Sequence, residues 1–425
     1  MNHELSIPFE RHQLSNGLRL ILSRDTTSPV VAVNLWYDVG SKNERPGRTG
    51  FAHLFEHMMF QGSEHVPASA HFAYIEKAGG SLNGSTWLDR TNYFDTVPSH
   101  FLELALWLES DRLGYLLPAM TQEKLDNQRD VVKNERRWRV DNQPYGDWDE
   151  RLQALLYPPD HPYHHSVIGS MEDLDAASLA DVEAFFRTYY APNNAVLTLC
   201  GDFESERARA LVDRYFGSLP RGPDIPPVPG RIELPAILGE SRREVIEQDI
   251  SLPRIYAAYR IPPYGHPAFY AATVAAHVLA DGKSALLYDR LVRTGMAQDV
   301  FAFPFPIVLG AAVLVTWATA SPRTSAERLE KALRDAMAQI EQAETPHVER
   351  AIRLIEADRL RALQQFEERA DTLSMYETLF RDPGRINTEL ERVRAVSAGD
   401  VRRFAAEFLG ANNRTTLVYL PRKAA

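Results

Sequence analysis

The sequence holds a single cysteine, Cys200, among 425 residues. No intrachain disulfide can form, and the apolar run AVLTLC that ends at this residue is typical of a buried small side chain rather than of a nucleophile. An excess of basic residues is also missing, since the formal net charge is -10. This acidic balance argues against a general nucleic-acid-binding protein and favours peptide or small-molecule partners.

Long uninterrupted apolar runs are scarce as well. The longest lies near residues 305–320, and Pro306 and Gly310 interrupt it, so it predicts a buried strand rather than a membrane span. The first residues, MNHELSIPFERHQ, contain no basic region followed by an apolar one. We therefore expect no signal or transit peptide and a cytoplasmic location, whereas a leader removed before residue 1 would indicate the periplasm.

The composition is that of an ordinary globular protein, with 44% hydrophobic and 24% charged residues. The chain is long for a single hydrophobic core. Six prolines lie between residues 218 and 242, which predicts an extended connection between two domains. We predict an N-terminal domain at 1–217, a linker at 218–242 and a C-terminal domain at 243–425.

One stretch, GFAHLFEHMMFQGS at residues 50–63, is apolar except for a His-x-x-Glu-His pattern and a polar end. Its composition predicts a buried helix, in which positions i, i+3 and i+4 share a face. His53, Glu56 and His57 therefore converge. A core helix with hydrogen-bonded histidines is the plain alternative, but buried polar groups need partners, and a metal ion would satisfy all three.

A further carboxylate completes a metal-ligand set. Residues 121–140 predict a long charged helix on which Glu135 shares a face with apolar residues. Catalytic zinc takes three protein ligands and keeps one position for water. His53, His57 and Glu135 are the expected ligands of one zinc ion per chain, and Glu56 is the expected general base that deprotonates the water.

The second half of the chain repeats the order of the first. The segment FYAATVAAHVLADGKS aligns with FAHLFEHMMFQGS when Gly282 is matched with Gly62. Thr273, Ala276 and His277 then fall on the positions of His53, Glu56 and His57. We interpret the C-terminal domain as a degenerate copy that kept the helix and lost the ligands.

The motif HLFEH, followed by Glu135 in NQRDVVKNERRWRVDNQPYG, resembles the inverted zincins of the pitrilysin/insulinase family, in particular their small bacterial members and the mitochondrial processing peptidase. The resemblance implies an α+β fold with two homologous domains. In the family, each domain is an antiparallel sheet with helices packed on one face, and the two enclose a peptide-binding chamber. It also implies a zinc endopeptidase acting on peptides or unfolded segments.

The resemblance extends to the segment GGSLNGST, which matches the edge strand where family members add the substrate backbone as an extra β-strand. An ordinary glycine-containing edge strand is the alternative. The expected substrate contacts are Asn83, Gly84, Ser85 and Thr86, with Asn83 and Thr86 foremost.

Two positions depart from the family pattern. Gln128 stands where many members have a second glutamate that supports the zinc site. We therefore expect a weaker metal affinity or a lower activity, but not the loss of the site. In the C-terminal domain, Arg293 is present, but Gln298 replaces the tyrosine of an arginine/tyrosine pair that grips substrate. We therefore expect a homologous partner subunit that supplies the pair in a heterodimer, or otherwise a homodimer.

Two rival interpretations stay open. The cluster HPYHH at 161–165 resembles a second metal site, but it lies in a proline-rich loop and adjacent side chains point apart. The chain as a whole also resembles non-catalytic structural or assembly subunits of the family. Such subunits usually lose one of the ligands or the base, whereas all four residues are present here.

Overall fold

The computed structural model describes residues 5–422, and these residues divide into two compact units. Unit 1 consists of residues up to 136, 165–229 and 360–388, and unit 2 consists of 137–164, 230–359 and the residues from 389 onwards. The predicted linker, 218–242, contains one of the crossings between the units, at Pro229–Gly230. The units differ from the contiguous domains that we predicted because each receives a segment from the other half of the sequence.

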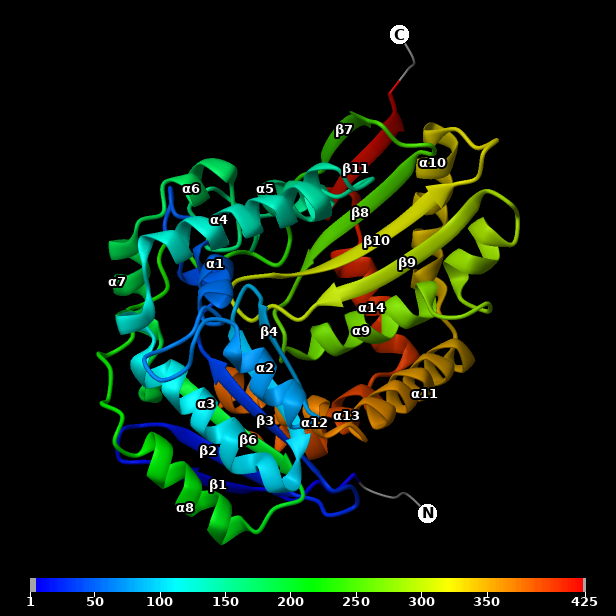
Figure 1. Cartoon of the computed structure of the whole chain (residues 1–425). Coiled ribbons are helices and arrows are strands. Elements are labelled where there is room, and N and C mark those ends of the chain that lie inside the picture. Colours follow the sequence, from blue (N-terminus) through cyan, green and yellow to red (C-terminus); the bar gives the residue numbers. More distant parts are fainter. Residues whose placement is uncertain (1–4, 423–425) are drawn as a thin grey trace. The chain divides into compact units, whose positions relative to one another are not determined.

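Unit 1 contains a six-stranded sheet with the strand order β1-β2-β6-β3-β5-β4 (Figure 1). Its strands are β1 (Glu10–Gln13), β2 (Arg19–Arg24), β3 (Val30–Tyr37), β4 (Ser81–Thr86), β5 (Thr91–Pro98) and β6 (Ala195–Gly201). Neighbouring strands are antiparallel except for the parallel pair β2–β6. The edge strand expected at GGSLNGST is confirmed as β4, which pairs with β5 and ends the sheet.

Helices of unit 1 cover both faces of this sheet. They are α1 (Phe51–Met58), α2 (Ala70–Lys77), α3 (Leu102–Tyr115), α4 (Gln122–Arg136), α6 (Met171–Asp175), α7 (Leu179–Tyr189), α8 (Ser205–Phe216) and α12 (Phe366–Phe380). Alternate β3 residues such as Val33 and Leu35 enter the main core, whereas Ala32 packs with Phe366 and Ala370 of α12. A helix from the second half of the sequence therefore covers the face that we expected to lack one.

Unit 2 contains a five-stranded sheet with the order β7-β11-β8-β10-β9 (Figure 1). Its strands are β7 (Arg242–Gln248), β8 (Arg254–Ile261), β9 (Ala297–Phe305), β10 (Ala312–Ala320) and β11 (Arg414–Pro421). Its helices are α5 (Trp148–Leu156), α9 (Pro267–Ala280), α10 (Ala326–Ala338) and α14 (Ala398–Phe408), while α11 (Thr345–Ala362) and α13 (Arg385–Arg394) cross its boundaries. The apolar run near 305–320 is the end of β9, a loop and the buried strand β10.

The exchange of helices is reciprocal. In unit 2, Trp148 of α5 stacks on Tyr256 of β8, with ring centroids 5.2 Å apart. The helix α5 comes from the first half of the sequence, just as α12 comes from the second. Within residues 5–422, no helix is long and apolar enough to cross a membrane.

Candidate metal centre

The helix α1 presents its polar residues on the side away from the core. Phe51, Leu54, Phe55 and Met58 are buried in the core of unit 1. His53, Glu56 and His57 lie on the other side and are half-buried. The helix is shorter than the predicted 50–63, because the chain turns after Met58 through Gly62, whose φ of 90° is left-handed.

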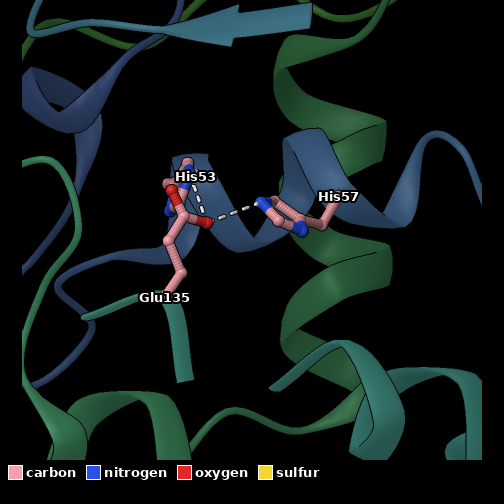
Figure 2. Close-up of side chains that lie close together, drawn as sticks. All are labelled: His53, His57 and Glu135. Atoms are coloured by element: carbon pink, nitrogen blue, oxygen red, sulfur yellow. Dashed lines mark ion pairs between the residues drawn. The ribbon is translucent and has the colours of Figure 1, made fainter. Parts of the chain in front are cut away.

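Glu135 lies near the end of α4 and reaches both histidines. Its Oε2 is 3.3 Å from His57 Nε2 and 3.7 Å from His53 Nε2. In Figure 2 both rings direct a nitrogen to the same oxygen of Glu135. On α4 Gln128 is buried two turns before Glu135, on the inner face with Val132. The three residues predicted as ligands therefore come together, and Gln128 lies on the same side of the helix.

The donor set fits a tetrahedral ion. One possible ligand atom from each residue lies within 4.8 Å of the others, and this is the one group of three such residues in the described part of the chain. Zinc binds imidazole nitrogen and carboxylate oxygen at about 2.0–2.2 Å, which puts tetrahedral ligands about 3.3–3.6 Å apart. The observed separations from Glu135 are close to these values, and three protein ligands leave a fourth position open.

Glu56 is held beside this group by the edge strand. The hydroxyl of Thr86 donates a hydrogen bond of 2.5 Å to Glu56 Oε2. Burial raises the pKa of Glu56, while the bond from Thr86 and the neighbouring His57 act in the opposite direction. A raised pKa increases the affinity of the carboxylate for a proton, as a general base near neutral pH requires.

The edge strand comes very close to α1 at Gly84. A Cβ atom at this position would lie 3.2 Å from the rings of Phe60 and Tyr93 and 3.3 Å from Glu56 Cγ. The absence of a side chain therefore lets β4 approach the helix that carries His53 and His57. Thr86 follows two residues later on the same face, which is why its hydroxyl reaches Glu56.

The two other predicted contact residues lie on the opposite face of β4. The hydroxyl of Ser85 donates to Asn92 Oδ1 at 2.7 Å, and Asn92 donates to Asp371 of α12. Asn83 is exposed, and its side chain accepts a hydrogen bond from the adjacent Gly84 nitrogen. Gly84 and Thr86 thus face Glu56, whereas Asn83 and Ser85 do not.

Arg90 is a residue near the site that the sequence did not single out. It donates to the Ser85 carbonyl oxygen at 2.8 Å and to Asn92 Oδ1 at 3.1 Å. Its charge also acts to lower the pKa of Glu56. These bonds all lie within the β4–β5 hairpin. An arginine in the turn was therefore the only feature of the sequence that could have pointed to this residue.

The second histidine cluster does not converge on a common point. Burial lowers the pKa of His161 to about 4, and its ring stacks on Tyr157. The Nδ1 of His164 lies 2.8 Å from the Tyr157 carbonyl oxygen, whereas the Nδ1 of His165 lies 3.4 Å from Glu44. These separate partners argue against a second metal site at this cluster.

The two residues of the incomplete pair belong to unit 2. Arg293 is exposed and forms an ion pair with Asp289. Gln298 is the second residue of the edge strand β9 and is also exposed. The described geometry of the metal centre involves neither of them.

Comparisons with known proteins agree with this architecture. Residues 19–157 match the family described as Insulinase (Peptidase family M16), and residues 176–354 match the Peptidase M16 inactive domain. The chain is 30% identical over 321 residues to the zinc protease PqqE of Helicobacter pylori, which covers 75% of this chain and 71% of that protein. It is 26% identical to a probable mitochondrial-processing peptidase subunit beta of Arabidopsis thaliana, over 71% of this chain and 58% of that one.

Solved structures match over nearly the whole length. The crystal structure of a protease from Helicobacter pylori aligns with a TM-score of 0.91 and 27% identity, covering 98% of this chain and all of that one. A structure described as a peptidase M16 inactive domain from Pseudomonas fluorescens aligns with a TM-score of 0.86 at 18% identity, covering 98% of this chain and 99% of that one. The second similarity supports the α+β fold alone.

Proposed function

Because the chain belongs to the insulinase family, peptidase family M16, we propose that it is a zinc-dependent endopeptidase acting on peptides or unfolded segments. The observation that carries the proposal is the convergence of His53, His57 and Glu135, with Glu56 beside them. A closed structural zinc site has four protein ligands and no use for a base. Three ligands with an adjacent carboxylate are instead the arrangement of a hydrolytic centre.

The residues of this chain divide the work of hydrolysis. Zinc at this position supplies Lewis acidity, which lowers the pKa of water and polarises a peptide carbonyl group. Glu56 takes the proton of the attacking water and then delivers it to the leaving amine nitrogen. Because Oε2 of Glu56 already accepts a hydrogen bond from Thr86, we assign the proton transfer to Oε1.

The open edge of β4 supports a role in substrate binding. Among the strands of residues 5–422, β4 pairs only with β5, so an extended peptide could add along its other side. Main-chain pairing of this kind binds many sequences with little dependence on side chains. A peptide added there would pass close to Glu56, because Thr86 is hydrogen-bonded to this residue and a Cβ atom at Gly84 would lie only 3.3 Å from Glu56 Cγ.

The non-catalytic alternative receives less support. The match to the inactive domain covers residues 176–354, which contain neither the three ligands nor Glu56. All four lie in the segment matched by the insulinase family. A subunit that had lost catalysis would not need to retain them together.

A peptide assay tests the proposal. A mixture of quenched-fluorescence peptides should be hydrolysed by the zinc-loaded chain, hydrolysis should stop with a chelator, and added zinc should restore it. Hydrolysis that a chelator does not stop would contradict the proposal. So would the absence of hydrolysis in a preparation that holds one zinc ion per chain and is supplied with a homologous partner.

The partner itself is a second part of the proposal. Gln298 cannot replace the phenol of the missing tyrosine, so a homologous subunit with an arginine/tyrosine pair should raise the rate. Titrating such a subunit into the assay measures this effect. Full activity of the lone chain, unchanged by any partner, would remove the heterodimer from the proposal.

A further inference from the structure

The N-terminus of α1 lacks the usual capping side chain. The helix follows Gly50, whose φ of 80° is left-handed, and no side chain at this position accepts a hydrogen bond from the first turn. The first backbone N–H groups of a helix need partners, especially where the end is buried. Here a residue from the preceding loop supplies them.

That residue is Glu44. Its Oε1 accepts a hydrogen bond from Ala52 N at 2.7 Å, and its Oε2 accepts one from Gly50 N at 3.0 Å. The side chain of Glu44 is completely buried. A carboxylate at this end of a helix also interacts favourably with the helix dipole. The first turn of α1, which carries His53, is therefore anchored by one buried side chain.

A segment comprising residues 165–177 packs against Glu44 and the start of α1. His165 Nδ1 lies 3.4 Å from Glu44 Oε2. Asp173 accepts hydrogen bonds from the backbone nitrogen and hydroxyl of Thr49, at 2.9 and 2.6 Å. A Cβ atom on Gly50 would lie 2.5 Å from the carbonyl oxygen of Ile168, so the two backbones touch. The N-terminus of α1 is thus clamped on several sides.

The same segment also holds α4, the helix of the third ligand. Arg129 donates to the carbonyl oxygens of Leu174 and Ala177 at 2.8 and 2.6 Å. Lys133 pairs with Asp175 at 2.6 Å, and Arg136 donates to the carbonyl oxygen of Gly169 at 2.8 Å. Segment 165–177 therefore connects the start of α1 with the face of α4 that leads to Glu135.

We propose that Glu44 is a positioning residue of the metal centre, which fixes the first turn of α1 so that His53 and His57 meet Glu135. This inference rests on the proposed zinc site. Glu44 touches neither substrate nor the ligand side chains in the contacts described, and it acts through the backbone of α1. Partners that orient metal ligands typically change metal affinity by 10–100-fold.

Glu44→Gln is the sharpest variant. The amide keeps one acceptor oxygen but places an NH2 group against one of the two backbone N–H donors, that of Gly50 or that of Ala52. Glu377→Gln is the matched control, because Glu377 is also completely buried in unit 1 and bound to Arg11, 2.8 Å away. Both changes remove one buried carboxylate, but only one of them lies at α1.

Zinc affinity is measured by competition with a chromophoric chelator, and hydrogen exchange of α1 amides is measured without metal. We expect Glu44→Gln to weaken zinc binding at least tenfold and to speed exchange of the α1 amides. Glu377→Gln should leave affinity within twofold, whatever its melting temperature. Unchanged affinity in Glu44→Gln, or equal weakening in both variants, would overturn the inference.

A second variant covers failure of Glu44→Gln to fold. Asp173→Asn removes charge from the same clamp at Thr49, and we expect it to weaken zinc binding at least threefold; an unchanged affinity would overturn the inference. The wild-type protein separates the two proposals. Tight zinc binding by wild type with no effect of these variants refutes the role of Glu44 alone, whereas no zinc binding by wild type refutes the zinc site and, with it, the inference.

Discussion

Helices α1 and α9 occupy corresponding places in two sheets of similar topology, but of the two only α1 carries residues of the candidate metal-ligand set. Without β1, the order β2-β6-β3-β5-β4 corresponds to β7-β11-β8-β10-β9, and each begins with a parallel pair. The helix follows β3 in one unit and β8 in the other. The comparison shows that the backbone arrangement does not require the three candidate ligands.

Two polar side chains of α9 have partners within or next to the helix itself. Thr273 donates to the Phe269 carbonyl oxygen at 2.9 Å, and His277 Nδ1 lies 2.8 Å from Asp281 Oδ2. Ala276, at the position of Glu56, is buried. The apolar pattern that packs a helix on a sheet is thus separable from the three or four polar residues that make a metal centre.

The largest expected effect distinguishes the two corresponding histidines. His57→Ala removes a proposed ligand, so zinc affinity should fall more than 100-fold and hydrolysis should be lost. His277→Ala should change both by less than twofold, because this side chain pairs with Asp281. Metal content after gel filtration measures the difference, and equal zinc retention by the two variants would contradict the assignment.

The next effect concerns the strand beside each helix. Thr86→Val removes the hydrogen bond to Glu56, and bonds to charged groups contribute about 1.5–3 kcal/mol, so kcat should fall about tenfold or more. The control is Thr316→Val in β10, where the hydroxyl donates to the Ala257 carbonyl oxygen. Steady-state kinetics should show an unchanged kcat for the control; a similar fall in both would point to a loss of packing instead.

A smaller effect concerns stability in acid. His71 is buried in α2 of unit 1, and burial lowers its pKa to about 3. The unfolded chain takes up a proton near the ordinary pKa of about 6.5, so stability falls as the pH drops from there towards 3. The loss from this residue should be about 1 kcal/mol between about pH 7 and pH 5.5.

The variant His71→Leu provides the measurement. Urea unfolding at both pH values should show that the variant loses about 1 kcal/mol less than wild type over this interval. The fluorescence signal must be assigned to unit 1, because the two units need not unfold together. An identical pH dependence in the two proteins would contradict the low pKa.

The smallest expected effect is on the face of β4 opposite to Glu56. Asn83 is exposed and bonds only locally in the contacts described, so Asn83→Ala should change KM by less than about threefold and leave kcat unaltered. A larger rise in KM would indicate that this side chain, and not only the backbone, reads the substrate. Kinetics with two unrelated peptides would decide between these outcomes.

Much of the site was predictable because its residues follow local periodicity. The spacing of His53, Glu56 and His57 places them on one helix face. In the same way, the spacing of Glu135 places it on the inner face of α4. The edge strand was also predictable, since glycine and alternating residues mark it. Each of these signals depends on neighbours within a few positions in the sequence.

The remaining features depend on contacts between distant segments. Glu44 binds backbone nitrogens, which leave no trace in the sequence, and Asp173 reaches Thr49 across more than a hundred positions. The exchange of α5 and α12 was missed because an amphipathic helix does not specify which sheet it covers. Only the three-dimensional structure relates these segments to the metal centre.

The most direct test of the central claim compares wild type with Glu56→Gln. Both proteins should bind one zinc ion, because Glu56 is not a ligand, but peptide hydrolysis by the variant should fall by a factor of about 10²–10⁴. Zinc content and hydrolysis are measured on the same preparations, with and without a homologous partner. Equal hydrolysis by the two zinc-loaded proteins would contradict the account.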